Sequence, residues 1–85
     1  KKNNILALAD NVMADKNQDV AYFLSFCIEQ YKNEKGLSGY AAMELFSRYN
    51  VLDYLAEHFD VLHTQNSRWI LEDIDEFIRT RQSNE

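Results

Sequence analysis

Residues 19–34 read DVAYFLSFCIEQYKNE, and the apolar residues of this stretch decide the fold. They recur every three or four positions, which is the period of an α-helix. One stripe consists of Val20, Phe23, Leu24, Cys27, Ile28 and Tyr31. Tyr22 and Phe26 lie on the opposite side, so the helix is apolar nearly all round. Such a helix usually lies at the centre of a bundle, with other helices on both of its sides.

The sequence before this stretch predicts a separate first helix over roughly residues 4–14. Its apolar residues share one face and are Ile5, Leu8, Ala9, Val12 and Met13. The polar run DKNQD at residues 15–19 is expected to be a turn, with Asp19 as the N-cap of the second helix. Two interpretations of Tyr22 and Phe26 are open: the first helix covers them, or they contact a partner.

After Gly36, the expected C-terminal cap of the second helix, Ser38 is expected to cap a third helix. Asn50 is expected to end that helix in a left-handed conformation. A fourth helix is predicted over about residues 51–63, because its apolar residues are three or four positions apart. These residues are Leu52, Leu55, Phe59 and Leu62. The sequence TQNS then forms a turn.

The C-terminal segment completes the predicted fold. RWIL at residues 68–71 is expected to be a short extended stretch, and a last helix ends near Arg81. The sequence therefore predicts a compact all-α bundle of four to five short helices, forming a single domain over residues 1–85 in which residues 1–17 hold the first helix and turn.

Composition and charge narrow the class of protein. The chain carries a net charge of −5, all of it in residues 36–85, where four arginines face nine acidic residues. Cys27 is the only cysteine, so no disulfide can form within the chain. No apolar run approaches the roughly 18 residues of a membrane span, and the KKNN start is unlike a signal peptide. We therefore expect a cytoplasmic protein without a membrane contact.

The stretch EHFDVLH at residues 57–63 is the one candidate metal or acid/base site. On a helix, His58 and His63 point about 140° apart, so one ion cannot easily bind both. The zinc-protease motif H-E-x-x-H is absent. We expect boundary histidines with ordinary hydrogen bonds, and a small metal-dependent enzyme using His58, Asp60 and His63 is the alternative.

No other pattern indicates catalysis or a cofactor. EDIDE at residues 72–76 is expected to be a solvated acidic cluster at the start of the last helix, where carboxylates offset the helix dipole. Cys27 lies within an apolar stripe and is expected to be structural. We therefore expect no catalytic residue, no metal and no cofactor, and a protein that is not an enzyme.

The third and fourth helices, separated near Asn50, resemble a helix-turn-helix in spacing, which makes nucleic-acid binding a further alternative. The second of these helices carries Asp53, Glu57 and Asp60 without a lysine or arginine. Such a helix would meet phosphate with like charge, so we expect no contact with nucleic acid.

A protein–protein contact is the remaining interpretation. Tyr54 and Val61 lie on the side of the fourth helix opposite its core stripe, and exposed aromatic residues often mark contacts with partners. The predicted partner-binding surface consists of Tyr54, Glu57, Val61, Arg68 and Trp69. It would bind a protein partner or a second copy of the chain.

The chain also resembles a family of small bacterial helical domains, the domain of unknown function 3791. The matching segments are FLSFCIEQYKNEKGLSG (23–39), ELFSRYNVLDYL (44–55), DVLHT (60–64) and EDIDEFI (72–78). The resemblance implies a short helical intracellular protein with no established catalytic residue. It also implies a partner that is similar to ADP-ribosyltransferases, which the helical protein would bind, restrain or present.

Overall fold

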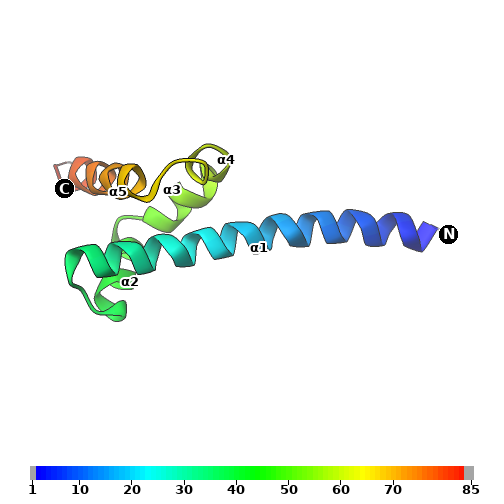
Figure 1. Cartoon of the computed structure of the whole chain (residues 1–85), viewed down its shortest axis with the longest axis horizontal. Helices are drawn as coiled ribbons and strands as arrows, with labels where there is room; N and C mark the ends of the chain where they lie inside the picture. The colour runs from blue at the N-terminus through cyan, green and yellow to red at the C-terminus, as the bar shows by residue number, and fades with distance from the viewer. Residues whose placement is uncertain (1, 84–85) are drawn as a thin grey trace.

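The computed structural model describes the backbone of residues 2–83 and the side chains of residues 16–83. Its helices are α1 (Lys2–Lys35), α2 (Gly39–Arg48), α3 (Val51–Glu57), α4 (Phe59–Leu62) and α5 (Ser67–Ser83). Residues 2–83 contain no strand, so the prediction of an all-α fold is confirmed. The four shorter helices gather along the C-terminal half of α1 (Figure 1).

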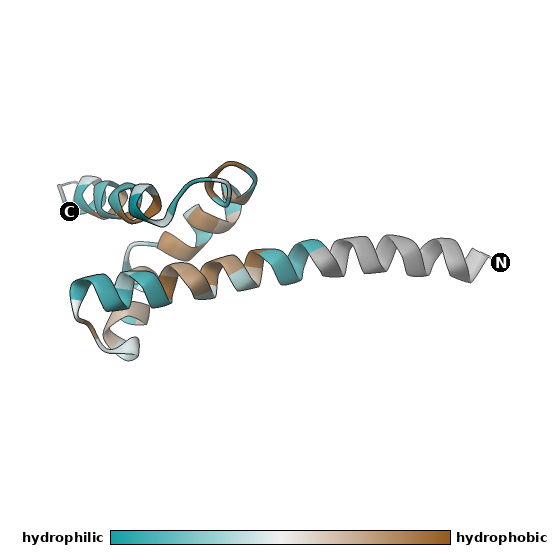
Figure 2. Ribbon diagram, viewed as in Figure 1, coloured by the Kyte–Doolittle hydropathy of each residue, from teal (hydrophilic) through white to brown (hydrophobic). Residues whose placement is uncertain are grey.

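The core forms on the predicted stripe of α1. Phe23, Cys27 and Tyr31 are buried there, and the rings of Phe23 and Tyr31 contact other helices. The Phe23 ring meets the Phe59 ring edge-on at 5.5 Å between centroids, and the Tyr31 ring lies 5.2 Å from that of Phe46. Figure 2 shows the hydrophobic residues on the middle of α1 and on α3. Burial of these side chains is the main favourable contribution to folding.

The expected turn at residues 15–19 is wrong, because α1 continues through it as one helix of 34 residues. The run DKNQD contains neither glycine nor proline, and lysine and glutamine are good helix formers. Asp19 is therefore an exposed residue within the helix and not an N-cap. The side chains of the predicted first helix, over residues 4–14, lie outside the described residues.

The continuity of α1 leaves the predicted second apolar side of the helix open. Tyr22 is 80% exposed and Phe26 is 41% exposed. A segment that continues the same helix extends along its axis and does not fold back over these two rings. The structure therefore shows Tyr22 and Phe26 at the surface, and does not agree with the interpretation that a first helix covers them.

The connections around α2 follow the expected capping chemistry. The hydroxyl oxygen Oγ of Ser38 accepts a hydrogen bond from the Ala41 amide at 3.0 Å, as an N-cap does. Gly36 ends α1 with φ of 65°, a left-handed conformation that glycine adopts without steric cost. Asn50 separates α2 from α3 and has φ of 58°, so it is the predicted left-handed terminator.

Two details of the C-terminal half differ from the prediction. The helix expected over residues 51–63 is divided at His58 into α3 and α4. RWIL is helical and not extended, because the Asn66 side-chain oxygen Oδ1 accepts a hydrogen bond from the Trp69 amide at 2.8 Å and so caps α5. The first turns of α5 then bury Ile70 and Leu71 against the core.

The continuity of α1 predicts the effect of proline at position 18. Gln18→Pro removes a backbone donor and clashes with the carbonyl of residue 14, which costs about 3 kcal/mol within a helix. We expect its helical circular dichroism at 222 nm to fall below that of Gln18→Ala, which keeps the amide. Equal signals from the two variants would show that residues 15–19 form a turn.

Candidate interaction groove

The acidic cluster of α5 forms bonds within the chain. Because α5 begins at Ser67, residues 72–76 lie in its middle and not in its first turn, which corrects the expected position of this cluster. The Tyr54 hydroxyl donates a hydrogen bond to Asp73 at 2.7 Å, and the Tyr31 hydroxyl donates one to Asp75 at 2.9 Å. Asp75 also pairs with the Lys35 ammonium at 2.8 Å. These carboxylates therefore tie α5 to α3 and α1.

Both tyrosines are held in their neutral form by these surroundings. Burial, followed by the hydrogen bond to Asp73 and the charge of that carboxylate, raises the pKa of Tyr54 from an ordinary value near 10 to about 12. The same causes, with Asp75 as the partner, raise the pKa of Tyr31 well above its ordinary range.

The two histidines and Asp60 have separate neighbours. The His63 ring stacks on the Phe59 ring at 4.3 Å between centroids, with its Nδ1 atom 2.7 Å from the Phe59 carbonyl oxygen. The His58 ring packs 4.9 Å from that of Tyr54. Asp60 accepts a hydrogen bond from the Lys16 ammonium at 3.1 Å. Among the side chains of residues 16–83, no three His, Cys, Asp or Glu residues are placed to hold a metal ion.

Cys27 lies inside the core, as the sequence predicts. It is 1% exposed, and burial raises the pKa of its thiol to about 12. A thiol with this pKa carries almost no thiolate near neutral pH, and thiolate is the reactive form.

The structure distributes the predicted partner-binding residues over several surroundings. Tyr54 is half-buried, because its ring stacks on the Phe77 ring of α5 at 4.2 Å, so the expectation that it lies on an uncovered side is wrong. Glu57 is exposed. Val61 and Trp69 are 62% and 43% exposed. The exposed Arg68 guanidinium pairs with Glu34 of α1 at 3.3 Å.

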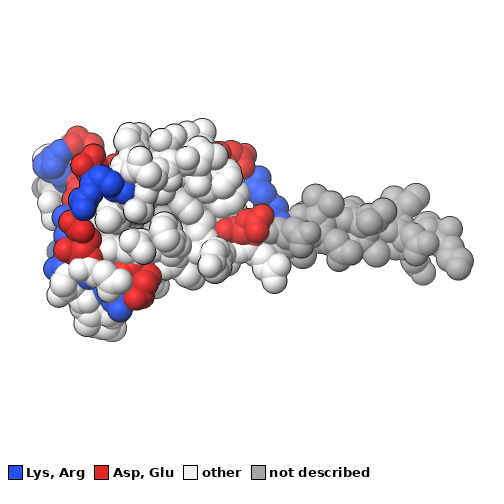
Figure 3. Space-filling view, viewed as in Figure 1, with Lys and Arg blue, Asp and Glu red and all other residues white. Residues whose placement is uncertain are grey.

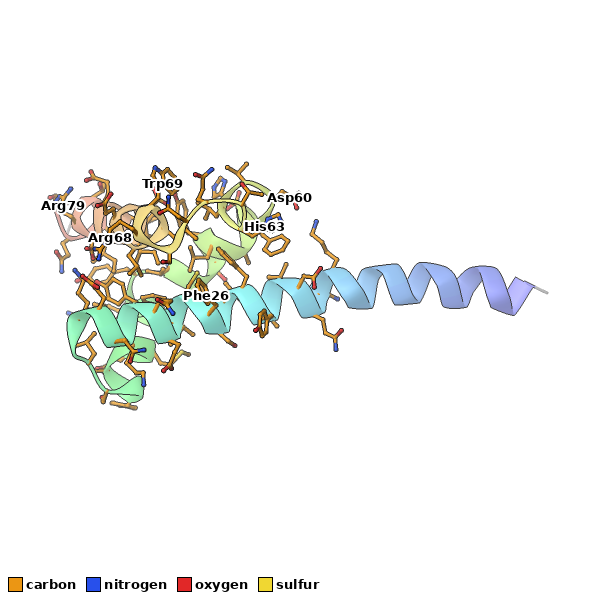
Figure 4. The ribbon with its side chains drawn as sticks, in the orientation of Figure 1. Phe26, Asp60, His63, Arg68, Trp69 and Arg79 are labelled. Atoms are coloured by element: carbon orange, nitrogen blue, oxygen red, sulfur yellow. The ribbon has the colours of Figure 1, made fainter. Side chains whose placement is uncertain are left out.

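A groove opens between α1 and the corner formed by α4 and the start of α5. Its volume is about 420 Å³. It is lined by Asp19, Tyr22, Phe23, Phe26, Phe59, His63, Gln65, Ser67 and Ile70. Figure 4 shows Phe26 on α1 and His63 at the end of α4, on two sides of this region. Exposed aromatic rings therefore stand beside a concave and largely apolar surface.

The lining of the groove is poor in charge, and so is much of one face of the molecule. Figure 3 shows a broad uncharged area with acidic and basic side chains gathered at its two ends. Asp19 is the one aspartate or glutamate in the lining, which contains no lysine or arginine. Sequence reasoning identified Tyr22 and Phe26 but not the groove, because its opposite side comes from residues 33 or more positions away along the chain.

The Tyr54–Asp73 hydrogen bond predicts a stability that depends on pH. Because the folded protein holds the Tyr54 proton to a higher pH than the unfolded chain does, this stabilisation is complete below pH 10 and is lost as the pH rises toward 12. Tyr54→Phe should lower the free energy of unfolding by about 0.5–1 kcal/mol at pH 7. Between pH 9 and pH 11, the free energy of unfolding, measured with urea, should fall less for Tyr54→Phe than for the wild type. A parallel decline in both proteins would contradict this assignment.

The position of Cys27 predicts slow thiol chemistry. At pH 8 the native protein should react with a disulfide reagent far more slowly than the protein in denaturant, because reaction requires opening of the core. Rapid stoichiometric labelling of the native protein would contradict the burial of this thiol.

Comparison with known protein families gave a match to most of the chain. A family model described as a protein of unknown function (DUF3791) matches residues 22–81. No curated protein and no solved structure gave a significant match. No helix within the described residues combines the length and the apolar character that a membrane span requires. The match covers most of the chain, all of α2, α3 and α4, and the core stripe of α1 from Phe23 onward, and the chain therefore belongs to the DUF3791 family.

Proposed function

We propose that this protein is a non-catalytic module that acts by binding another protein through the groove between α1 and the α4–α5 corner. The observation that carries the proposal is the exposure of Tyr22 and Phe26 beside that groove. Large aromatic side chains at the edge of a concave apolar surface are typical of the anchors that dominate protein interfaces.

Burial of this apolar surface by a partner would lower the free energy. Apolar surface removed from water stabilises a complex by about 25 cal/mol per Å² before the costs of association. Val61 of α4 and Trp69 of α5 are also exposed, and both lie outside the lining of the groove. The predicted contributions of Val61 and Trp69 are therefore kept in the proposal, whereas Tyr54 is assigned to the fold.

The arrangement of ionisable groups supports a binding role over a catalytic one. A general acid and base require two titratable groups that reach one reacting centre. Within residues 16–83, Asp60, Asp73 and Asp75 each bind a lysine or tyrosine of another helix, and His63 stacks on a core phenylalanine. Each of these groups has a structural contact that explains its position.

The similarity to the family suggests which partner to examine first. The resemblance implies an ADP-ribosyltransferase-like protein beside this one, and we propose that the groove binds such a protein and regulates it. The fold offers a helical surface for this purpose, since one wall of the groove belongs to the long helix α1.

Site-specific photocrosslinking tests the proposed surface. A photoreactive phenylalanine analogue at Phe26 should give one dominant adduct in the native cell, and mass spectrometry would identify the adduct. The matched control places the same analogue at Met43, an exposed apolar residue on α2. Equal adducts from the two positions, or none from Phe26, would contradict the groove as the contact surface.

A further inference from the structure

We propose that the occupant of the groove is a cationic amphipathic helix of another protein, which inserts apolar side chains along the groove and places a lysine or arginine against Asp19. This inference rests on the proposed function and adds the chemistry of the partner.

The length of the groove fits a helix. Its wall on α1 runs from Asp19 through Tyr22 to Phe26, which is two helical turns or about 10 Å. A helix that lies in such a groove presents apolar side chains at positions i, i+3 or i+4, and i+7, which span the same distance. Because Tyr22 is mostly exposed, its ring can contact the side of a helix that lies in the groove.

Ion pairs cross from α1 to the opposite helices outside the lining of the groove. Lys16 pairs with Asp60 of α4 at one end, and Glu34 pairs with Arg68 of α5 at the other. Figure 4 shows Asp60 and Arg68 on opposite sides of Phe26. Each pair is neutral, so neither pair favours a partner of one sign.

Asp19 decides the sign of the partner's charge. It is exposed and forms no ion pair with the other described side chains. The net charge of −5 acts in the same direction, because it attracts cationic proteins and repels anionic ones. A second copy of the chain carries the same −5 and is therefore the less favoured occupant.

A pair of designed peptides tests this chemistry. One is a helical peptide of leucine at core positions and lysine elsewhere, and the other replaces each lysine with glutamate. We expect the leucine–lysine peptide to bind with one-to-one stoichiometry at physiological salt, measured by anisotropy of a labelled peptide. The leucine–glutamate peptide should bind at least tenfold more weakly. Equal binding of both peptides, or of neither, would overturn the inference.

Matched variants separate the groove from general attraction between opposite charges. Asp19→Asn should weaken binding of the leucine–lysine peptide about two- to fivefold, the value of an exposed ion pair, whereas Asp53→Asn removes one charge from α3 and should have a clearly smaller effect. Phe26→Ala should weaken binding about tenfold or more, and Met43→Ala should not. Equal losses within either pair would contradict binding in the groove.

Failure of this inference is distinguishable from failure of the proposed function. An adduct at Phe26 whose partner segment is acidic or uncharged would overturn the cationic helix and leave the binding role intact. Sedimentation that shows a dimer which Phe26→Ala dissociates would identify a second copy as the occupant and overturn the inference. If no adduct forms at Phe26 and neither peptide binds, both proposals are wrong.

Discussion

The packing of Phe23, Cys27 and Tyr31 against the shorter helices is the contact on which the rest of the structure depends. These residues form one stripe on α1, and α2, α3 and α5 all contact that helix. Because the buried residues of α1 form one stripe, Tyr22 and Phe26 lie on its flank and remain 80% and 41% exposed. The open groove is thus a direct consequence of how the core forms.

The polar contacts fix the helices that the core brings together. Tyr31 and Tyr54 donate hydrogen bonds to neighbouring carboxylates on α5, and ion pairs join α1 to α4 and α5. Individually, exposed ion pairs contribute little to stability. Together they orient α4 and α5 relative to α1, and this orientation sets the width of the groove. The acidic residues of the C-terminal half therefore help to hold the two walls of the groove in place.

The sequence alone predicted the elements whose signals are local. The helical period of residues 19–34, the cap at Ser38 and the left-handed residue Asn50 all depend on a few neighbouring positions, and all were correct. The polar run DKNQD continues the helix where a turn is predicted, because polarity alone does not end a helix that lacks glycine and proline. RWIL is helical where an extended stretch is predicted, because the Asn66 side chain caps the helix that follows it.

The candidate site was only partly predictable, for a physical reason. Tyr22 and Phe26 lie opposite the core stripe at helical spacing. The sequence alone therefore predicts that α1 has a second apolar surface at these two residues. The groove and the burial of Tyr54 both depend on contacts with α4 or α5, whose positions no local pattern specifies. Asp19 lines the groove together with residues between positions 59 and 70, which are far from it in the sequence. Its position beside the groove is therefore not visible in the sequence alone.

The central claim is that α1 buries a single stripe of side chains and leaves Tyr22 and Phe26 at the surface, and nuclear Overhauser contacts between aromatic rings measure this most directly. The structure predicts contacts between the rings of Phe23 and Phe59 and between those of Tyr31 and Phe46. It predicts none between the ring of Tyr22 or Phe26 and residues 4–14. Contacts from either exposed ring to that N-terminal segment would show a helix folded back over the groove and would contradict the account.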